Sequence, residues 1–304
     1  MLISEEYFEP LERGALADEI PSPARSFARD AWARFSRNRL ALAGLVLLVL
    51  VILFAVFGPL LSPYPYDGMD SFSRNLPSSP QHWFGTDQMG RDIFTRVLYG
   101  ARISLLIGFA STAINLAIGV VYGGISGYAG GRADMIMMRV VDVIYAVPAM
   151  IYMILLMLIF GSNIYSVMLG ICVNGWVSMA RIVRSQILTL KEQEFATAAW
   201  VIGASRSRIL FRHLLLNCLG PVTVTVTLMI PQAIFTEAFL SFIGIGISAP
   251  QASLGTLAQD AKMQLTFFPM QMVWPVLVIC LVIFSLNFIS EGLEDALNPK
   301  GNGQ

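Results

Sequence analysis

Long apolar segments alternate with shorter polar ones along most of the chain. Six of them, near residues 40–61, 103–124, 140–160, 164–180, 220–242 and 272–289, are expected to cross a membrane core of about 30 Å as helices. The fourth is short, and it becomes long enough if its helix continues past Arg181 and Arg184, whose side chains can extend to the interface. The pattern predicts an all-α integral membrane protein.

The residues before the first apolar segment divide into two parts. Residues 1–25 contain six acidic residues, scattered prolines and no long apolar stretch, which predicts a flexible cytoplasmic tail and no cleavable signal peptide. Residues 26–39 predict an amphipathic helix that lies in the lipid headgroup layer, because aromatic residues such as Trp32 and Phe35 alternate with arginines. The alternative is a disordered basic tail. The six predicted spans make residues 40–299 the transmembrane domain.

Residues 62–102 form a long connection that we expect outside the cell. It begins with prolines and a turn-forming cluster, and either Thr86 or Asp87 can cap a helix that follows. We expect this helix to lie on the outer membrane surface before the chain enters the bilayer. Its apolar face would consist of Ile93, Phe94, Val97 and Leu98.

The connection at residues 181–219 predicts two short helices joined by a tight turn. Apolar residues recur at helical spacing at Phe195, Ala198, Ala199 and Ile202. Gly203 then fits a left-handed C-terminal cap, and Ser205 can cap a second helix over residues 206–216. Because a simple linker does not need two capped helices, we expect a docking element. An ordinary surface helix is the alternative.

The fifth apolar segment carries polar residues along one side. Thr225, Met229, Gln232 and Thr236 form one helical stripe, and Pro231 removes a helical hydrogen bond beside it. This stripe suits a water-filled path through the membrane. Alternatively, the hydroxyls bond to their own helix and Gln232 bonds to a neighbouring helix. Glu237 is expected near the outer surface, as a gate element or an interfacial residue.

Three further patterns predict how the spans pack. Arg139 and Asp142 are three residues apart and can form an ion pair, while Pro148 is expected to kink the third span. Glycines spaced four residues apart in the second span predict close approach of another helix, and these are Gly119, Gly123 and Gly127.

Composition and charge support a membrane protein with a defined orientation. The chain has 304 residues, of which 56% are hydrophobic and 13% charged, whereas soluble domains have about 25% charged residues. Its net charge of zero does not suggest a nucleic-acid partner. Fifteen of the 20 basic residues fall on the same side as the N-terminus. The positive-inside rule therefore predicts cytoplasmic termini and a cytoplasmic 181–219 connection.

The sequence contains no motif of a common catalytic or metal-binding site. None of the lysines follows a glycine, so the chain has no P-loop for ATP hydrolysis. The predicted topology separates His82 from His213, which excludes a shared metal site or catalytic dyad. The three cysteines lie in or beside apolar segments without metal-ligand spacing, and we expect them to be buried. We therefore predict no metal, no cofactor and no catalytic residue in this chain.

The 181–219 connection resembles the EAA loop of bacterial ABC importer permeases. The matching residues are Ala198, Ala199, Gly203, Ala204, Phe211 and Leu215. Thr197 and Leu216 depart from the usual Glu and Pro. The resemblance implies that this loop docks in a cleft of an ATP-hydrolysing subunit. The residues expected to couple to it are Phe195, Ala198, Ala199, Ile202, Gly203, Ala204, Ser205 and Arg208.

A second set of motifs narrows the resemblance. Residues 84–87, 90–92 and 99–105 resemble the dipeptide, oligopeptide and nickel subgroup, specifically its second permease subunit. The resemblance implies a type I importer permease fold in the bacterial inner membrane. The implied partners are a different permease subunit, two ATPase subunits that hold ATP and Mg, and an extracytoplasmic solute-binding protein. Peptides are the expected substrate. Nickel or another small solute, a stand-alone secondary transporter and a membrane enzyme are the alternatives.

Overall fold

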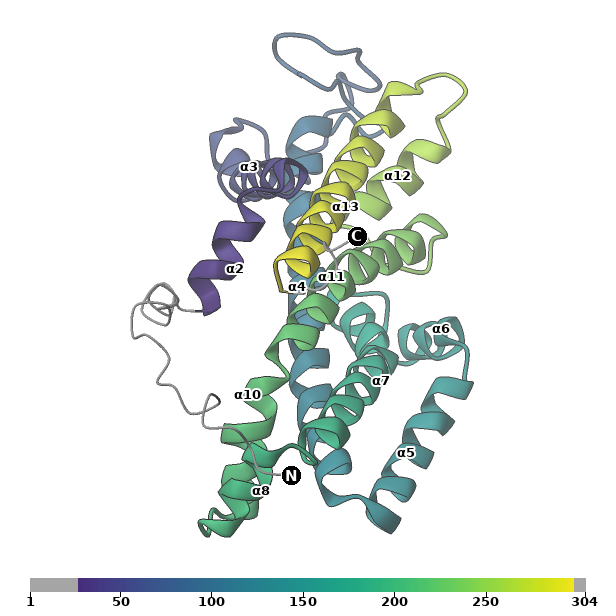
Figure 1. Ribbon diagram of the computed structural model, residues 1–304. Coiled ribbons are helices and arrows are strands. Elements are labelled where there is room, and N and C mark those ends of the chain that lie inside the picture. Colours follow the sequence, from purple (N-terminus) through teal and green to yellow (C-terminus); the bar gives the residue numbers. More distant parts are fainter. Residues whose placement is uncertain (1–26, 298–304) are drawn as a thin grey trace, which may run out of the picture.

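The computed structural model describes residues 27–297, which are helical apart from turns and loops and contain no β-strand longer than an isolated bridge (Figure 1). The elements are α2 (Phe27–Phe35), α3 (Arg39–Leu61), α4 (Ile93–Ala129), α5 (Gly131–Ala146), α6 (Ala149–Phe160), α7 (Ile164–Leu190), α8 (Glu194–Val201), α9 (Arg206–Arg208), η2 (Ile209–Leu214), α10 (Leu215–Asn217), α11 (Leu219–Phe242), α12 (Leu254–Lys262) and α13 (Met270–Leu297). The predicted tail at residues 1–25 lies outside the described residues.

Five of these helices, α3, α4, α7, α11 and α13, are each long and apolar enough to cross a membrane, and α5 with α6 makes up to six. The fourth span continues to Leu190, as predicted for a helix that passes both arginines. Several helices are longer than the apolar segments, because hydropathy marks the part in lipid and not the polar turns that continue the helix. Helix α2 occupies most of the predicted amphipathic segment.

The third span is a broken helix. Helices α5 and α6 meet at an angle of 79°. Val147, which precedes Pro148, has an extended backbone (φ −84°, ψ 124°). A residue before proline is disfavoured in the helical region, and proline has no N–H to continue the helical hydrogen bonds. The expected kink at Pro148 is therefore a complete break between two helices.

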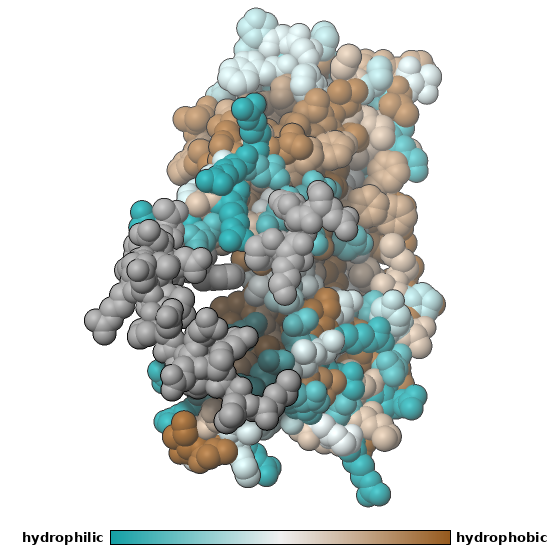
Figure 2. Space-filling model, viewed as in Figure 1, coloured by the Kyte–Doolittle hydropathy of each residue, from teal (hydrophilic) through white to brown (hydrophobic). Residues whose placement is uncertain are grey.

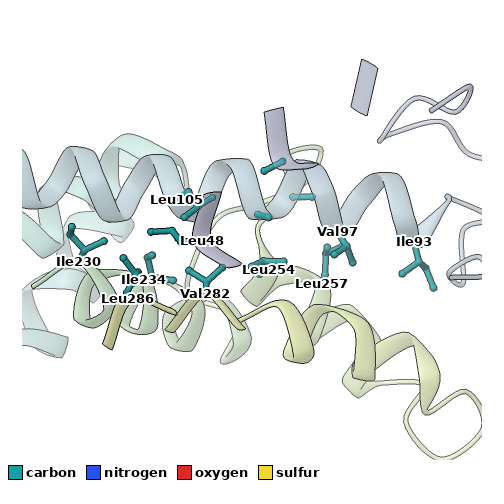
Figure 3. Close-up of a cluster of buried hydrophobic side chains, with 13 residues drawn as sticks. Leu48, Ile93, Val97, Leu105, Ile230, Ile234, Leu254, Leu257, Val282 and Leu286 are labelled. Atoms are coloured by element: carbon teal, nitrogen blue, oxygen red, sulfur yellow. The ribbon is translucent and has the colours of Figure 1, made fainter. Parts of the chain in front are cut away.

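The predicted surface helix after the external loop is instead the beginning of α4. Asp92 caps it by accepting a hydrogen bond from the Thr95 N–H at 2.8 Å, so neither Thr86 nor Asp87 is the cap. Ile93 and Val97 belong to a buried cluster that includes Leu254 and Leu257 of α12, and Figure 3 shows Val97 beside Leu257. Periodicity showed an apolar face, but the helix that covers it comes from more than 150 residues further along the chain.

The buried cluster in Figure 3 joins five helices. Side chains from α3, α4, α11, α12 and α13 meet there, among them Leu48, Leu105, Ile230, Ile234, Val282 and Leu286. Figure 2 shows that much of the surface at the same level is apolar. That surface is expected for helices that face lipid or another membrane subunit. Among the cysteines, Cys280 is exposed, contrary to the prediction, whereas the other two are buried.

Glycines allow α4 and α7 to pack closely, as the sequence predicted. A Cβ atom on Gly119 would lie 2.6 Å from Cβ of Met179, and one on Gly127 would lie 2.9 Å from the Arg184 carbonyl oxygen. At Gly123 the added atom would overlap the carbonyl oxygen of Ala180. The two helix backbones can therefore approach only where these residues have no side chain.

Ion pairs between α5 and α7 differ from the expected one. Asp142 binds Arg181 of α7 at 2.9 Å and is not paired with Arg139. Arg184 donates two hydrogen bonds to Asp134, at 2.5 and 2.6 Å. Spacing along one helix indicated a possible pair, but packing brings α7 arginines closer to both aspartates.

Candidate functional site

The connection between α7 and α11 forms a rigid elbow, here defined as residues 194–217. Helix α8 ends at a Schellman motif, in which the Ala204 N–H donates to the Ala199 carbonyl at 3.0 Å and the Gly203 N–H donates to the Trp200 carbonyl at 2.9 Å. Gly203 has φ +89°, which confirms the predicted left-handed cap. The predicted cap at Ser205 is also confirmed, since its hydroxyl accepts from the Arg208 N–H at 3.3 Å.

The second arm of the elbow is continuous with the fifth span. It consists of α9, a π-helical segment η2 and α10, where the sequence predicted one regular helix. Cys218 joins it to α11 with nearly helical dihedral angles (φ −84°, ψ −5°). A displacement of the elbow therefore acts directly on α11, because no flexible loop separates them.

A buried cluster holds the elbow against the membrane helices. Ala196 of α8 packs in this cluster with Ile209 and Leu214 of η2 and with Val183 and Ile187 of α7. All five are at least 95% buried. The elbow is thus fixed to its own chain through α7 and α11.

The opposite side of α8 is apolar and exposed. Trp200, Val201 and Ile202 are 68%, 72% and 86% exposed, and Phe195 is also exposed. Figure 2 shows a separate apolar patch at the lower end of the molecule, where α8 lies in Figure 1. The sequence predicted that Ala199 shares one apolar helical face with Phe195, Ala198 and Ile202. The structure packs Ala199 partly against its own chain, and Trp200, which sequence reasoning did not select, is exposed instead.

The remaining candidate coupling residues lie around the turn. Ala198, Ser205 and Arg208 are exposed, and Ala204 is half-buried. The elbow therefore presents a compact apolar end beside a basic arm that also carries Arg206. An exposed apolar surface of this kind marks a contact with another protein or with lipid.

A membrane cavity of about 480 Å³ lies beside α11. All four residues of the predicted stripe, Thr225, Met229, Gln232 and Thr236, line it. The hydroxyls of Thr225 and Thr236 also donate to carbonyls of their own helix, each at 2.8 Å. The threonines can therefore line the cavity and bond to their own helix at the same time. Sequence reasoning did not select the other lining residues, which come from α4, α6, α7 and α11: Asn115, Ala149, Met150, Met153, Ile171, Asn174, Gly175, Ser178, Leu228 and Ala233.

Glu237 does not line the cavity and is not interfacial. Its side chain is fully buried, and it accepts hydrogen bonds from Ser104 of α4 at 2.7 Å and from Ser241 at 2.9 Å. The Ser104 hydroxyl also accepts from the Leu254 N–H at the start of α12. Glu237 therefore joins α11 to α4 and α12. Position along the helix suggested exposure, but these neighbours cover it.

Two acids and two arginines tie the connection at residues 62–92 and the start of α4 to α12. Asp87 accepts from Arg91 at 2.7 Å and from Arg96 at 2.6 Å, and Asp260 of α12 accepts from the same arginines at 3.2 and 3.4 Å. Asp70 lies further out in the same loop. The Ser73 hydroxyl and the Phe72 N–H donate to Asp70 and hold the pKa of this carboxyl below its ordinary value.

The elbow is attached to α11, which lines a partly polar cavity, and this arrangement can transmit a movement from one end of the molecule to the cavity. Comparison with known families identifies the class. A family model described as binding-protein-dependent transport system inner membrane component matches residues 119–302. The chain belongs to this family. A second model, described as the N-terminal TM domain of oligopeptide transport permease C, matches residues 26–77 of the permease.

Curated relatives match nearly the whole permease. It is 46% identical over 299 residues to an oligopeptide transport system permease protein, OppC, of Bacillus subtilis (strain 168), with 98% of each chain covered. It is 44% identical to the dipeptide transport system permease protein DppC of the same organism, with 95% of this chain and 91% of the relative covered. An OppC protein of Escherichia coli (strain K12) is 40% identical over 302 residues.

A solved structure shares the fold. The inward-facing MetNI methionine ABC transporter has a chain that aligns with a TM-score of 0.54 at 16% identity, covering 67% of this chain and 96% of that one. The permease therefore has the type I ABC importer permease fold. It is the transmembrane permease subunit of an ABC importer. Within residues 27–297 no group of three or more His, Cys, Asp or Glu side chains is placed to hold a metal ion.

Proposed function

We propose that this permease forms, with a second and different permease subunit, the path through which an ABC importer carries di- or oligopeptides across a bacterial inner membrane. The observation that carries the proposal is its similarity, over nearly its full length, to relatives named as oligopeptide and dipeptide transport permeases. The cavity beside α11 supports it, because its lining is polar in places and contains no charged residue. Such a lining suits solutes of varied charge better than it suits a metal cation.

The proposed machine has three other kinds of subunit. Two ATPase subunits hold ATP and Mg and dock on the elbows, and an extracytoplasmic solute-binding protein delivers the substrate. We propose that this chain takes no part in the hydrolysis, since none of its lysines follows a glycine as a P-loop requires, and that it binds no cofactor itself. We propose that both termini and the elbow face the cytoplasm, while residues 62–102 face outward. The lipid bilayer surrounds the remaining helices.

Coupling follows from the way the elbow is built. The exposed apolar end of α8, with Phe195, Trp200 and Ile202, suits a cleft in an ATPase subunit. When ATP draws the two ATPase subunits together, each elbow moves as one body because its inner face is fixed to α7 and α11. The movement then reaches α11, whose polar stripe lines the cavity. Hydrolysis and product release reverse it.

The experiment is uptake by the reassembled importer. The permease, its partner permease, the two ATPases and the binding protein are reconstituted in vesicles, and uptake of radiolabelled trialanine and of ⁶³Ni²⁺ is measured with ATP inside. We expect ATP-dependent uptake of trialanine and none of nickel. Uptake of nickel alone would contradict the peptide assignment.

Orientation is tested separately by single cysteines at Ser73 and Ser207 in a background without the native cysteines. We expect an impermeant thiol reagent to label the first in intact cells and the second only after the membrane is opened. Labelling of both in intact cells would contradict the proposed topology.

A further inference from the structure

Three carboxamide side chains from three different helices meet at the membrane cavity. Asn115 of α4, Asn174 of α7 and Gln232 of α11 all line it. Asn115 is only 2% exposed, and its Oδ1 atom has no hydrogen-bond partner among the described residues. Oδ1 of Asn174 is also buried without a hydrogen-bond partner among the described residues. Buried polar atoms of folded proteins are nearly always paired, so two unpaired amide oxygens at one cavity call for an explanation.

The position of Asn115 is built into the helix packing. A Cβ atom on Gly175 of α7 would lie 2.7 Å from Cγ of Asn115, closer than any real contact of this kind. Glycine at this position therefore leaves the space that the Asn115 carboxamide occupies. Gly175 and Asn115 both line the cavity, so the buried amide lies directly at the cavity wall.

The rest of the lining limits what such a solute can be. None of the lining residues is charged, so the cavity offers no ion pair to a charged group. Three of them are methionines, Met150, Met153 and Met229, whose flexible side chains adapt to apolar groups of different shapes. A carboxamide both donates and accepts hydrogen bonds, which matches the N–H and C=O of a peptide group. Every peptide carries these groups whatever its side chains.

We propose that Asn115, Asn174 and Gln232 form a transport site that binds the backbone amide groups of a passing peptide without regard to its sequence. This inference rests on the proposed function in peptide import. The cavity volume of about 480 Å³ falls within the range of about 300–1,000 Å³ for small-molecule sites. Hydrogen bonds from the peptide would pair the amide oxygens that the permease itself leaves unpaired.

The test replaces each buried amide by an apolar group of similar size, in Asn115→Leu and Asn174→Leu. Uptake of radiolabelled trialanine is measured in the reconstituted importer at a fixed, saturating concentration of loaded binding protein. We expect each variant to lower uptake about fivefold, the effect of one lost hydrogen bond. Stimulation of ATP hydrolysis by loaded binding protein should persist, because docking of that protein does not involve the cavity. More ATP would then be used for each peptide carried.

Two further measurements separate a transport role from a structural one. The melting temperature of the purified complex should stay equal or rise in both variants, since each removes a buried unpaired amide oxygen. An analogue of trialanine with an ester in place of one of its two amides should be carried more slowly by the wild type, with a smaller further loss in Asn115→Leu. The matched control is Asn287→Leu on α13, outside the cavity, which should leave uptake and melting temperature unchanged.

Unchanged uptake in both variants would overturn the proposal. So would a lower melting temperature together with loss of the partner permease, because the amides would then pair with that subunit across the interface. Neither result would contradict the proposed function, which fails only if the wild-type importer carries no trialanine.

Discussion

Replacing Gly203 tests whether the elbow between α8 and α9 must keep its shape. Gly203 has φ +89°, and no heavy atom lies within 4 Å of a Cβ atom built on it. A substitution there meets no neighbour, so its whole cost comes from the backbone. The cost is about 1 kcal/mol for alanine and about 2–3 kcal/mol for the β-branched valine. A loss of about 2 kcal/mol lowers the ratio of native to non-native turn about 30-fold.

The assay measures the amount of each variant in the membrane, its binding of the ATPases and its effect on ATP hydrolysis. The variants Gly203→Asn, Gly203→Ala and Gly203→Val are expressed with the partner subunits, and their amounts in the membrane are compared. We expect near-normal amounts, because the turn lies outside the spans. Copurification of the ATPases, and ATP hydrolysis stimulated by loaded binding protein, should fall in that order. Asparagine tolerates the left-handed conformation and should lose least.

Gly220 provides a matched control on the same chain. It lies in α11, has no positive φ, and a Cβ atom on it also meets no heavy atom within 4 Å. Gly220→Val therefore adds the same side chain without left-handed strain and should keep most of the coupling. Full stimulation in Gly203→Val, or equal losses in all three variants at Gly203, would refute the reasoning that the elbow transmits force through a fixed turn.

Two further predictions concern stability. Gly123→Ala should lower the melting temperature of the purified permease, because the added Cβ atom overlaps α7 and destabilises the fold by about 1–3 kcal/mol. Gly124→Ala is the control and should have a much smaller effect, since its Cβ atom would lie 3.3 Å from its nearest neighbour. Equal melting temperatures of the two variants would contradict the α4–α7 packing. Asp87→Ala should destabilise by about 3–5 kcal/mol, because it leaves two buried guanidinium groups with only Asp260, and should reduce the yield of folded protein. Asp142→Ala removes an exposed ion pair and should change the melting temperature little, so similar losses in the two aspartate variants would argue against a special role of Asp87 in pairing the two buried arginines.

Local features of the elbow were decided by the sequence. A glycine after the last periodic residue and a serine two positions later are enough to predict the turn, because caps depend on hydrogen bonds within a few residues. The glycines at spacing of four likewise predicted a close helix contact, since only residues without side chains permit one. The stripe on α11 was visible as a helical repeat of polar residues.

Contacts between distant segments were decided only by the tertiary structure. The apolar face at the start of α4 looked suited to lipid until α12 covered it, and Glu237 looked interfacial until α4 and α12 enclosed it. Arg181, distant in sequence, displaced the expected partner of Asp142. Asn115 and Asn174 carry no local pattern, and they become a candidate site only because four helices enclose one cavity. Periodicity defines the apolar face of a helix, but whether lipid, water or another helix lies against it depends on packing between segments far apart in the chain.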